Sequence, residues 1–321
     1  MFKTVLKQLS PAGARGRLSI LIFHRVLPQT DPIFPGEVDA AAFDAICGWL
    51  AAWCNVLPLD TAVQQLKNGT LPERATAITF DDGYADNRTV AQPILTRHGL
   101  PCSFFIATDF LDGGRMWNDT VIEAVRHCRT PELDLSSLQK PDGSGDLGRH
   151  ALGSPDARRQ AIESILGQIK YLPVAERKTL TERIADQAAV TPANDLMMTS
   201  QQLRELRAAG MQIGAHTRSH PILAKLSADD AHAEIADSRR FLEDVLGERV
   251  GLFAYPNGKP GTDYIPESVR IVRELGFDAA VSTTKGAADA NTDLFQIPRF
   301  TPWDRSKLRF GARFADNLWR A

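Results

Sequence analysis

The sequence predicts an α/β protein built as a deformed (β/α)7-type barrel with a helical insertion. Short apolar runs, typical of buried strands, alternate with amphipathic helical segments, and this alternation predicts a parallel sheet. The strand-helix unit recurs about seven times, which favours a closed or nearly closed barrel. We therefore expect the functional residues at one edge of the barrel, where the loops that leave parallel strands gather.

The first part of the chain shows this alternation clearly. Apolar, β-rich runs predict strands over residues 18–26, 55–59, 77–80 and 102–107. Helices are expected between them over residues 40–53, 61–66 and 90–98. Gly69 and Gly99 follow the second and third of these helices as stop signals.

The pattern breaks after Trp117. Residues 131–155 are rich in Gly, Ser, Asp and Pro, which predicts a mobile loop. Apolar residues at helical spacing predict three helices around it, at residues 118–128, 162–169 and 174–184. We expect a single domain over residues 1–321, with this loop and these helices as an insertion at about 118–195.

The alternation resumes after the insertion. Thr199 with Gln202 has the pattern of a capping box, and Ser227 with Asp230 opens a second, long helix. A further helix is expected over residues 265–275. The remaining strands are expected over residues 211–215, 250–255, 277–282 and 294–300.

Composition excludes several classes of function. The 321 residues are 43% hydrophobic and 24% charged, which is ordinary for a globular protein. Lys and Arg number 37 against 39 Asp and Glu, for a net charge of -2, so nucleic acid is not an expected partner. The apolar run at residues 18–23 is too short for a signal-peptide core, and we expect no transmembrane segment. With four cysteines and no C-x-x-C pair, the sequence fits a cytoplasmic protein.

Two adjacent carboxylates follow the expected strand at residues 77–80. Asp81 and Asp82 stand at its carboxyl end, and Gly83 forms the turn that leaves it. Asp and Gly are also common in ordinary turns after strands, so these residues alone do not establish a site.

Two histidines follow another expected strand. His216 and His220 are separated by three residues, so both rings can converge if the segment turns, and Pro221 argues against a continuing helix. Two imidazoles with one carboxylate form a ligand set for a divalent ion such as Zn²⁺ that leaves a position for water. The second acid of the Asp81-Asp82 pair can then act as a general base. His-x-x-x-His alone is a weak signal, but with Asp-Asp-Gly at a neighbouring strand end it becomes strong.

These two motifs resemble those of the carbohydrate esterase family 4 polysaccharide deacetylases, which carry the nodulation-type homology domain. The resemblance spans residues of about 18–128 and 196–305. It implies a deformed barrel and metal-dependent removal of N-acetyl groups from amino sugars. It also implies that Asp81 is the catalytic base and that Asp82, His216 and His220 bind the metal.

The third motif departs from the family pattern, which is usually Arg-x-Pro-aromatic. Residues 253–258 read Phe-Ala-Tyr-Pro-Asn-Gly, so Ala254 stands at the arginine position and Asn257 at the aromatic one. The backbone N–H of Asn257 can still serve as the oxyanion donor. The arginine that holds the base aspartate in the family needs a substitute, for which Arg299 is the candidate. The alternative for Arg299 is an ordinary surface ion pair.

The late Leu-x-His motif of the family, which supplies a catalytic acid, is not found near the C-terminus. His24, in Ile-Phe-His-Arg-Val, is similar to the Tyr-His segment of poly-N-acetylglucosamine deacetylases whose motif order is permuted. Since the first and last strands of a barrel are neighbours, His24 could protonate the leaving amine; the alternative is a core histidine. Tyr84, Trp117 and Trp303 could form sugar-stacking walls or could pack in the core or at its rim.

The expected function is that of a metal-dependent N-deacetylase. Its partner would be an N-acetylated amino-sugar polymer or oligosaccharide, acetate would be released, and the metal would be Zn²⁺, with Co²⁺ or Ni²⁺ as alternatives. One alternative is deformylation or deacetylation of a small or lipid-linked amino sugar, or amide hydrolysis of a non-sugar substrate. Others are an Fe(II) oxygenase and a non-catalytic sugar-binding relative.

Overall fold

The protein, seen in a computed structural model, is described here over residues 2–141, 143–302 and 304–319. Its residues pack into two compact units. Unit 1 consists of Met1–Gln29, Val38–Asp112 and Met198–Ala321, and unit 2 of Thr30–Glu37 and Gly113–Met197. Unit 2 contains the expected insertion, while a single domain over the whole chain stays a prediction.

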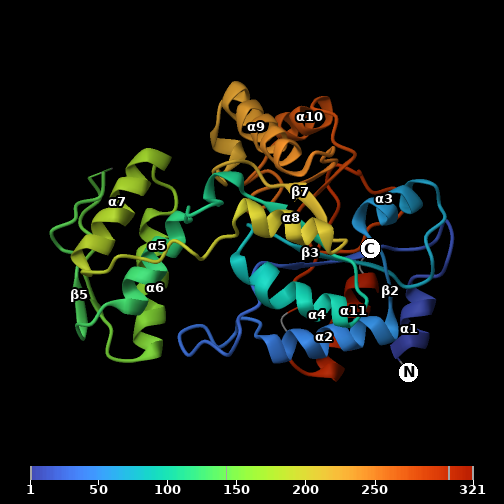
Figure 1. Cartoon of the computed structure of the whole chain (residues 1–321), viewed down its shortest axis with the longest axis horizontal. Helices are drawn as coiled ribbons and strands as arrows, with labels where there is room; N and C mark the ends of the chain where they lie inside the picture. The colour runs from blue at the N-terminus through green and yellow to red at the C-terminus, as the bar shows by residue number, and fades with distance from the viewer. Residues whose placement is uncertain (1, 142, 303, 320–321) are drawn as a thin grey trace. The chain divides into compact units, whose positions relative to one another are not determined.

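Unit 1 is built on a seven-stranded sheet in which every neighbouring pair is parallel (Figure 1). The strands pair in the order β1-β3-β4-β7-β8-β9, and β2 pairs with the start of β3. Their bounds are β1 (Ser19–Phe23), β2 (Asn55–Val56), β3 (Ala75–Phe80), β4 (Ser103–Ile106), β7 (Gln212–Ala215), β8 (Leu252–Ala254) and β9 (Ala279–Val281).

A short extended segment at residues 297–300 joins the two edges of this sheet. Ile297 forms a parallel bridge to Val281 of β9, and Phe300 forms one to Leu21 of β1. The Phe300 N–H donates to the Ile20 carbonyl at 2.9 Å. The strand predicted at 294–300 is therefore reduced to single bridges, in a segment where Pro298 lacks an N–H for the ladder. The curled sheet confirms the predicted α/β deformed barrel.

Helices surround this sheet and mostly follow the sequence pattern. The predicted helix at residues 40–53 is α2, and Thr199 and Gln202 form the predicted capping box at the start of α8. The helix expected at 90–98 instead begins with a π-helical turn, η1 (Asn87–Ala91). The α-helices of unit 1 are α1 (Phe2–Leu9), α2 (Ala40–Trp53), α3 (Leu59–Lys67), α4 (Gln92–Arg97), α8 (Ser200–Ala208), α9 (Ala228–Leu246), α10 (Pro266–Glu274) and α11 (Lys307–Trp319). Two short 3-10 turns are η2 (Thr108–Phe110) and η3 (Leu223–Lys225).

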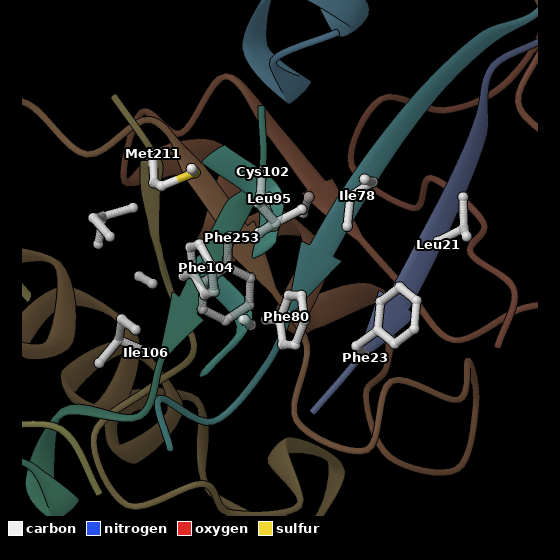
Figure 2. Close-up of a cluster of buried hydrophobic side chains, with 14 of the residues drawn as sticks. Leu21, Phe23, Ile78, Phe80, Leu95, Cys102, Phe104, Ile106, Met211 and Phe253 are labelled. Carbon is white, nitrogen blue, oxygen red and sulfur yellow. The ribbon is translucent and has the colours of Figure 1, made fainter. Parts of the chain in front are cut away.

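Alternate side chains of the strands enter two separate cores, as the two-residue period of a strand requires. Phe23, Phe80 and Phe104 stand side by side on neighbouring strands and stack at centroid distances of 5.2 Å (Figure 2). They belong to the larger core, which includes buried residues of α2, α4, α9 and α11. The opposite face forms a smaller core of residues that include Ile20, Ala75, Ala77, Phe105, Ala254, Val281 and Ile297.

Unit 2 has its own core. It contains α5 (Trp117–His127), α6 (Pro155–Ile169) and α7 (Val174–Gln187), close to the predicted helices. Residues 131–155 are not an unstructured loop, because β5 (Glu132–Asp134) and β6 (Arg149–Ala151) form an antiparallel pair there. The buried side chains that anchor this segment are Leu133, Leu135, Leu138, Leu147 and Leu152. Turn-forming residues outnumber these leucines in the segment, and for this reason the sequence analysis did not predict the β5–β6 pair.

A search of the helices formed by the described residues finds none with the length and apolar character needed to cross a membrane.

One glycine has a direct packing role beneath the site. A methyl group at Gly214 of β7 would lie 2.5 Å from the ring of Phe105, and the Arg299 guanidinium carbon lies 5.7 Å from the centroid of that ring. Phe105 therefore occupies the space that the missing side chain of Gly214 leaves, between β7 and Arg299.

Replacing Gly214 with alanine should lower the free energy of unfolding by about 1–3 kcal/mol, because Phe105 must move within a packed core. Gly48→Ala in α2 is a matched control: the nearest atom to its added methyl group is His98 Cε1 at 3.6 Å. Since alanine favours helix, the control should keep or raise stability by up to about 1 kcal/mol. Chemical denaturation of both variants measures the difference, and equal stability would contradict the packing role.

Candidate active site

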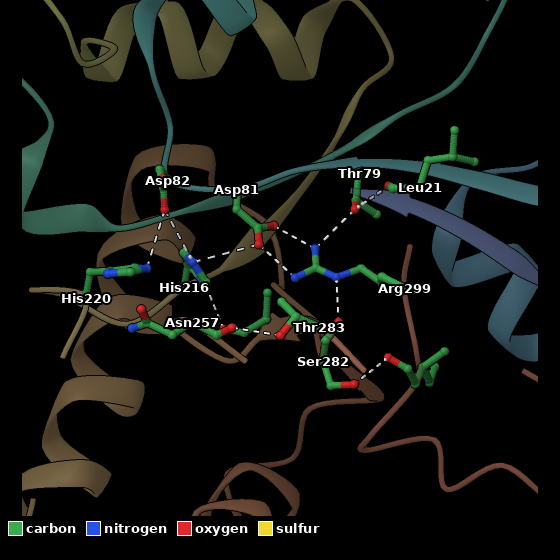
Figure 3. Close-up of polar contacts among 12 residues, drawn as sticks. Leu21, Thr79, Asp81, Asp82, His216, His220, Asn257, Ser282, Thr283 and Arg299 are labelled. Atoms are coloured by element: carbon green, nitrogen blue, oxygen red, sulfur yellow. Dashed lines mark hydrogen bonds and ion pairs between the residues drawn. The ribbon is translucent and has the colours of Figure 1, made fainter. Parts of the chain in front are cut away.

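The expected site residues come from the carboxyl ends of strands in the same sheet, with β4 between β3 and β7. Asp81 and Asp82 follow β3, His216 follows β7, and Arg299 belongs to the closing segment at residues 297–300. Figure 3 shows their side chains meeting in one cluster. The parallel order of the strands explains this, since their carboxyl ends share one edge of the sheet.

Asp81 is held by a buried arginine. Both guanidinium nitrogens of Arg299 donate to the two carboxylate oxygens of Asp81 at 2.7 Å, in a bidentate fork. The same guanidinium donates to Thr79 Oγ1 at 3.1 Å and to the Ser282 carbonyl at 2.9 Å. Arg299 is 1% exposed, so it is not a surface ion pair. Burial alone would raise the pKa of Asp81, but Arg299 and His216 outweigh it and hold that pKa below its ordinary value.

Asp82, His216 and His220 bring three ligand atoms together. Oδ1 of Asp82 lies 3.5 Å from Nε2 of His216 and 3.5 Å from Nε2 of His220. All three ligand atoms lie within 4.8 Å of one another. Among the described residues, Asp82 Oδ1 is buried without a hydrogen bond.

One nitrogen of each histidine ring, Nε2, faces this cluster. Nδ1 of His216 lies 2.7 Å from the Ala254 carbonyl and donates to it, which directs Nε2 toward Asp82. Burial alone would lower the pKa of His216, but Asp81 and Asp82 outweigh it and raise that pKa, so a metal ion would displace a proton from Nε2. Burial lowers the pKa of His220 to about 4, so this imidazole is neutral near pH 7. Neutral imidazoles and a carboxylate are the forms that ligate metals.

Two of the three separations between these ligand atoms match those around a tetrahedral metal. Bonds of roughly 2.0–2.1 Å at the tetrahedral angle separate neighbouring ligand atoms by about 3.4 Å. The two 3.5 Å separations from Asp82 Oδ1 agree with that value. A buried carboxylate oxygen without a hydrogen bond is explained if a cation is its partner. The three residues therefore fit a divalent metal with a fourth position left for water.

The backbone around the cluster is strained. Asp82, Thr217, His220 and Asn257 all have positive φ, at 76°, 64°, 53° and 58°. Such backbone is uncommon outside glycine, and is a clear outlier for a β-branched residue such as Thr217. Strained residues of this kind cluster at functional sites.

Asn257 follows β8 and is exposed beside the cluster. Its carbonyl accepts a hydrogen bond from Thr283 Oγ1 at 2.8 Å, which holds the turn after Pro256. Among the described residues, its backbone N–H has no hydrogen-bond acceptor. That N–H is available to a ligand.

His24 is exposed at the end of β1 and is not a core histidine. Asp81 and Asp82 both have a lowered pKa, chiefly because Arg299 and His216 outweigh burial at Asp81 and because His216 and His220 do so at Asp82. Asn87 Nδ2 donates to the His24 carbonyl at 2.9 Å, and Asp86 accepts from Arg25 Nε at 2.7 Å. The sequence prediction missed Asp86 and Asn87. Asp86 and Asn87 follow the Asp81-Asp82 pair by only a few residues, and this proximity could have indicated that they lie near the site.

Two of the three expected sugar-stacking aromatics are packed against arginines. Tyr84 is 4% exposed and has the Arg25 guanidinium carbon 4.6 Å from its ring centroid. Trp117, in unit 2, has Arg177 at 4.6 Å from its ring centroid. Trp303 lies outside the described residues. Packing therefore accounts for Tyr84, and the stacking role of Trp303 stays a prediction.

Arg299→Ala is expected to lower the free energy of unfolding of the metal-free protein by about 3–5 kcal/mol, because it leaves the buried Asp81 carboxylate without its partner. Arg299→Lys should lower the free energy of unfolding less than Arg299→Ala does, because lysine keeps the positive charge but cannot form the bidentate contact. Arg270, exposed in α10 between Glu267 and Glu274, provides the control, and Arg270→Ala should change little. Denaturant titration compares them. An unchanged midpoint for Arg299→Ala would refute the importance of the pair.

Comparisons with known proteins identify relatives of this chain. Residues 178–280 match the family model described as polysaccharide deacetylase. A homologue, YxkH of Bacillus subtilis (strain 168), is 19% identical over 285 residues, which cover 88% of this chain and 70% of YxkH. The matched residues include His216 and His220, while Asp81, Asp82 and Arg299 lie outside the family-model match.

Solved structures share the fold. The Streptococcus pyogenes deacetylase PplD in complex with acetate superposes with a TM-score of 0.58 and 20% identity, covering 89% of this chain and 92% of PplD. A de-N-acetylase from Aggregatibacter actinomycetemcomitans gives a TM-score of 0.59 and 16% identity, covering 93% of this chain and 99% of that one. The resemblance to the polysaccharide deacetylases found in the sequence is confirmed by the family-model match and by the similarity to YxkH.

Proposed function

We propose that this protein is a metal-dependent N-deacetylase that removes acetyl groups from N-acetylated amino sugars of a polysaccharide or oligosaccharide, releasing acetate. The observation that carries the proposal is the position of the Asp81 carboxylate. Arg299 binds this carboxylate, and its Oδ2 atom lies 4.0 Å from Nε2 of His216, a candidate metal ligand. The family match and the fold shared with a de-N-acetylase support it. The cytoplasmic location and the lack of a nucleic-acid partner stay predictions from the sequence.

Asp82, His216 and His220 would hold the metal, for which we propose Zn²⁺, with Co²⁺ or Ni²⁺ as alternatives. When bound, such an ion supplies Lewis-acid polarisation of the acetamide carbonyl and a lower pKa for water. Hydrolysis by this set uses no second substrate besides water, whereas the Fe(II) oxygenase alternative finds no support in the family match.

Three further residues act as the base, the oxyanion donor and the acid of the proposed reaction. Asp81, ionised because Arg299 and His216 lower its pKa, takes a proton from the water that attacks the acetyl carbon. The Asn257 N–H donates to the carbonyl oxygen as negative charge develops there. His24 gives a proton to the nitrogen as the carbon–nitrogen bond breaks, so the products are acetate and a free amine.

Asp81→Asn should lose most turnover but keep the metal, because the base is outside the ligand set. His216→Ala should lose metal and activity together. Acetate release from defined N-acetylated oligosaccharides, with metal-stripped and metal-restored protein, measures turnover, and elemental analysis measures the metal. His232→Ala, an exposed residue of α9, is the control. Wild-type activity in either site variant would refute the mechanism. Parallel assays on single and lipid-linked amino sugars test the alternative substrates.

His24→Gln is expected to lose about 10²–10⁴-fold in turnover of an N-acetylated sugar, because an amine leaves poorly without a proton. The same variant should still hydrolyse an aryl acetate ester, whose leaving group needs no proton. Asp81→Asn should be impaired on both substrates. A His24→Gln enzyme that loses both reactions to the same extent would exclude the acid role and indicate a structural one.

A further inference from the structure

The loop between the two histidine ligands is held by a glutamate from a different part of the fold. Glu234 lies on α9 and is partly buried. Its Oε2 accepts from the backbone N–H groups of Arg218 and Ser219, both at 2.9 Å, and its Oε1 accepts from Ser219 Oγ at 2.7 Å. One carboxylate therefore binds the centre of the His216–His220 loop through three donors.

This loop needs external support because its backbone is unfavourable. Thr217 and His220, on either side of the centre, have φ of 64° and 53°. These left-handed turns reverse the chain so that the His216 and His220 rings approach to a centroid distance of 4.8 Å. Without external support, Thr217 and His220 would relax toward ordinary backbone conformations, and the His220 ring would move away from Asp82.

The other contacts of the loop use its carbonyl groups and the Arg218 side chain, which also lies 3.5 Å from Asp237 of α9. The N–H groups of Thr108 and Asp109 donate to the Thr217 and Arg218 carbonyls at 3.2 Å and 3.0 Å. The Arg218 side chain donates to Asp109 at 2.9 Å. Among the described residues, only Glu234 accepts from the two central backbone N–H groups.

We propose that Glu234 is a positioning residue for the metal centre. It touches none of the ligand atoms, and it acts by keeping the loop turned so that Nε2 of His220 stays 3.5 Å from Asp82 Oδ1. Residues that orient metal ligands commonly contribute about 10–100-fold to metal affinity. The inference rests on the proposed metal site, but it concerns affinity and not the chemical step.

Three variants separate positioning from a general effect on folding. Glu234→Ala removes all three acceptor contacts. Glu234→Gln keeps an oxygen for the two N–H groups, and its amide can donate to Ser219 Oγ, so it should restore the turn. Ser219→Ala removes only the side-chain contact. Asp244→Ala, an exposed acid on the same helix with no hydrogen bond or ion pair among the described residues, is the matched control.

The experiment measures Zn²⁺ affinity of metal-stripped full-length protein by competition with a chromophoric chelator, beside the thermal midpoint of each metal-free variant. Glu234→Ala should bind Zn²⁺ about 10–100-fold more weakly than wild type. Ser219→Ala should lose less Zn²⁺ affinity than Glu234→Ala. The Zn²⁺ affinities of Glu234→Gln and Asp244→Ala should stay close to that of wild type. If Glu234→Ala does not fold, the Ser219→Ala and Glu234→Gln affinities decide.

The outcomes distinguish this inference from the proposed function. Wild-type Zn²⁺ affinity in Glu234→Ala, or in Ser219→Ala if the first variant is unfolded, overturns the positioning role alone. A Glu234→Gln variant as weak as Glu234→Ala also overturns it, because the acceptor geometry would not be what matters. Wild-type protein that binds Zn²⁺ but releases no acetate overturns the deacetylase proposal and leaves the positioning role supported by the affinities. Wild-type protein that binds no divalent metal overturns both.

Discussion

The ion pair between Arg299 and Asp81 is the interaction on which the geometry of the site depends. Arg299 lies in the segment that closes the barrel between β9 and β1, and Asp81 follows β3, so one fork of hydrogen bonds ties the closing segment to the acid. A buried pair adds little net stability because both charges lose water, yet either partner alone is costly. Its effect is therefore mainly geometric, since it sets where the Asp81 carboxylate stands beside the three ligand candidates.

The cluster beside this pair combines rigid strands with strained turns. The strands place His216 and Asp81 through ordinary ladder bonds, whereas Asp82, His220 and Asn257 stand in left-handed backbone just beyond strand ends. Left-handed residues persist only where their surroundings determine them. Here polar contacts do so, including Thr283 at the Asn257 carbonyl and Glu234 at the His216–His220 loop. Hydrogen bonds from elements distant in sequence therefore stabilise this strained backbone.

What the sequence could predict follows from how local each signal is. Helix α2 and the cap at Thr199 depend on neighbouring residues and were predicted at their observed bounds. Helix α11 was missed, although Phe310, Phe314 and Leu318 recur every four residues, because Gly311 and several charges interrupt the pattern. In the site, strand ends predicted which side chains meet. Glu234 gave no signal, since a charged residue on a long helix is usually only part of a solvated face.

The third motif differs from the deacetylase pattern at its arginine position. A side chain from elsewhere in the sequence can still occupy the corresponding place in space. The family pattern has an arginine where this chain has Ala254, and Ala254 is fully buried at the end of β8. Its carbonyl still orients His216, because that contact uses the backbone and needs no particular side chain. The guanidinium comes instead from Arg299, on the closing segment, which bridges to the next strand, β9, through Ile297. Because parallel strands bring their carboxyl ends to one edge, an arginine that moves along the chain can still reach the same aspartate. In this chain, a planar and permanently charged guanidinium binds the aspartate from the closing segment.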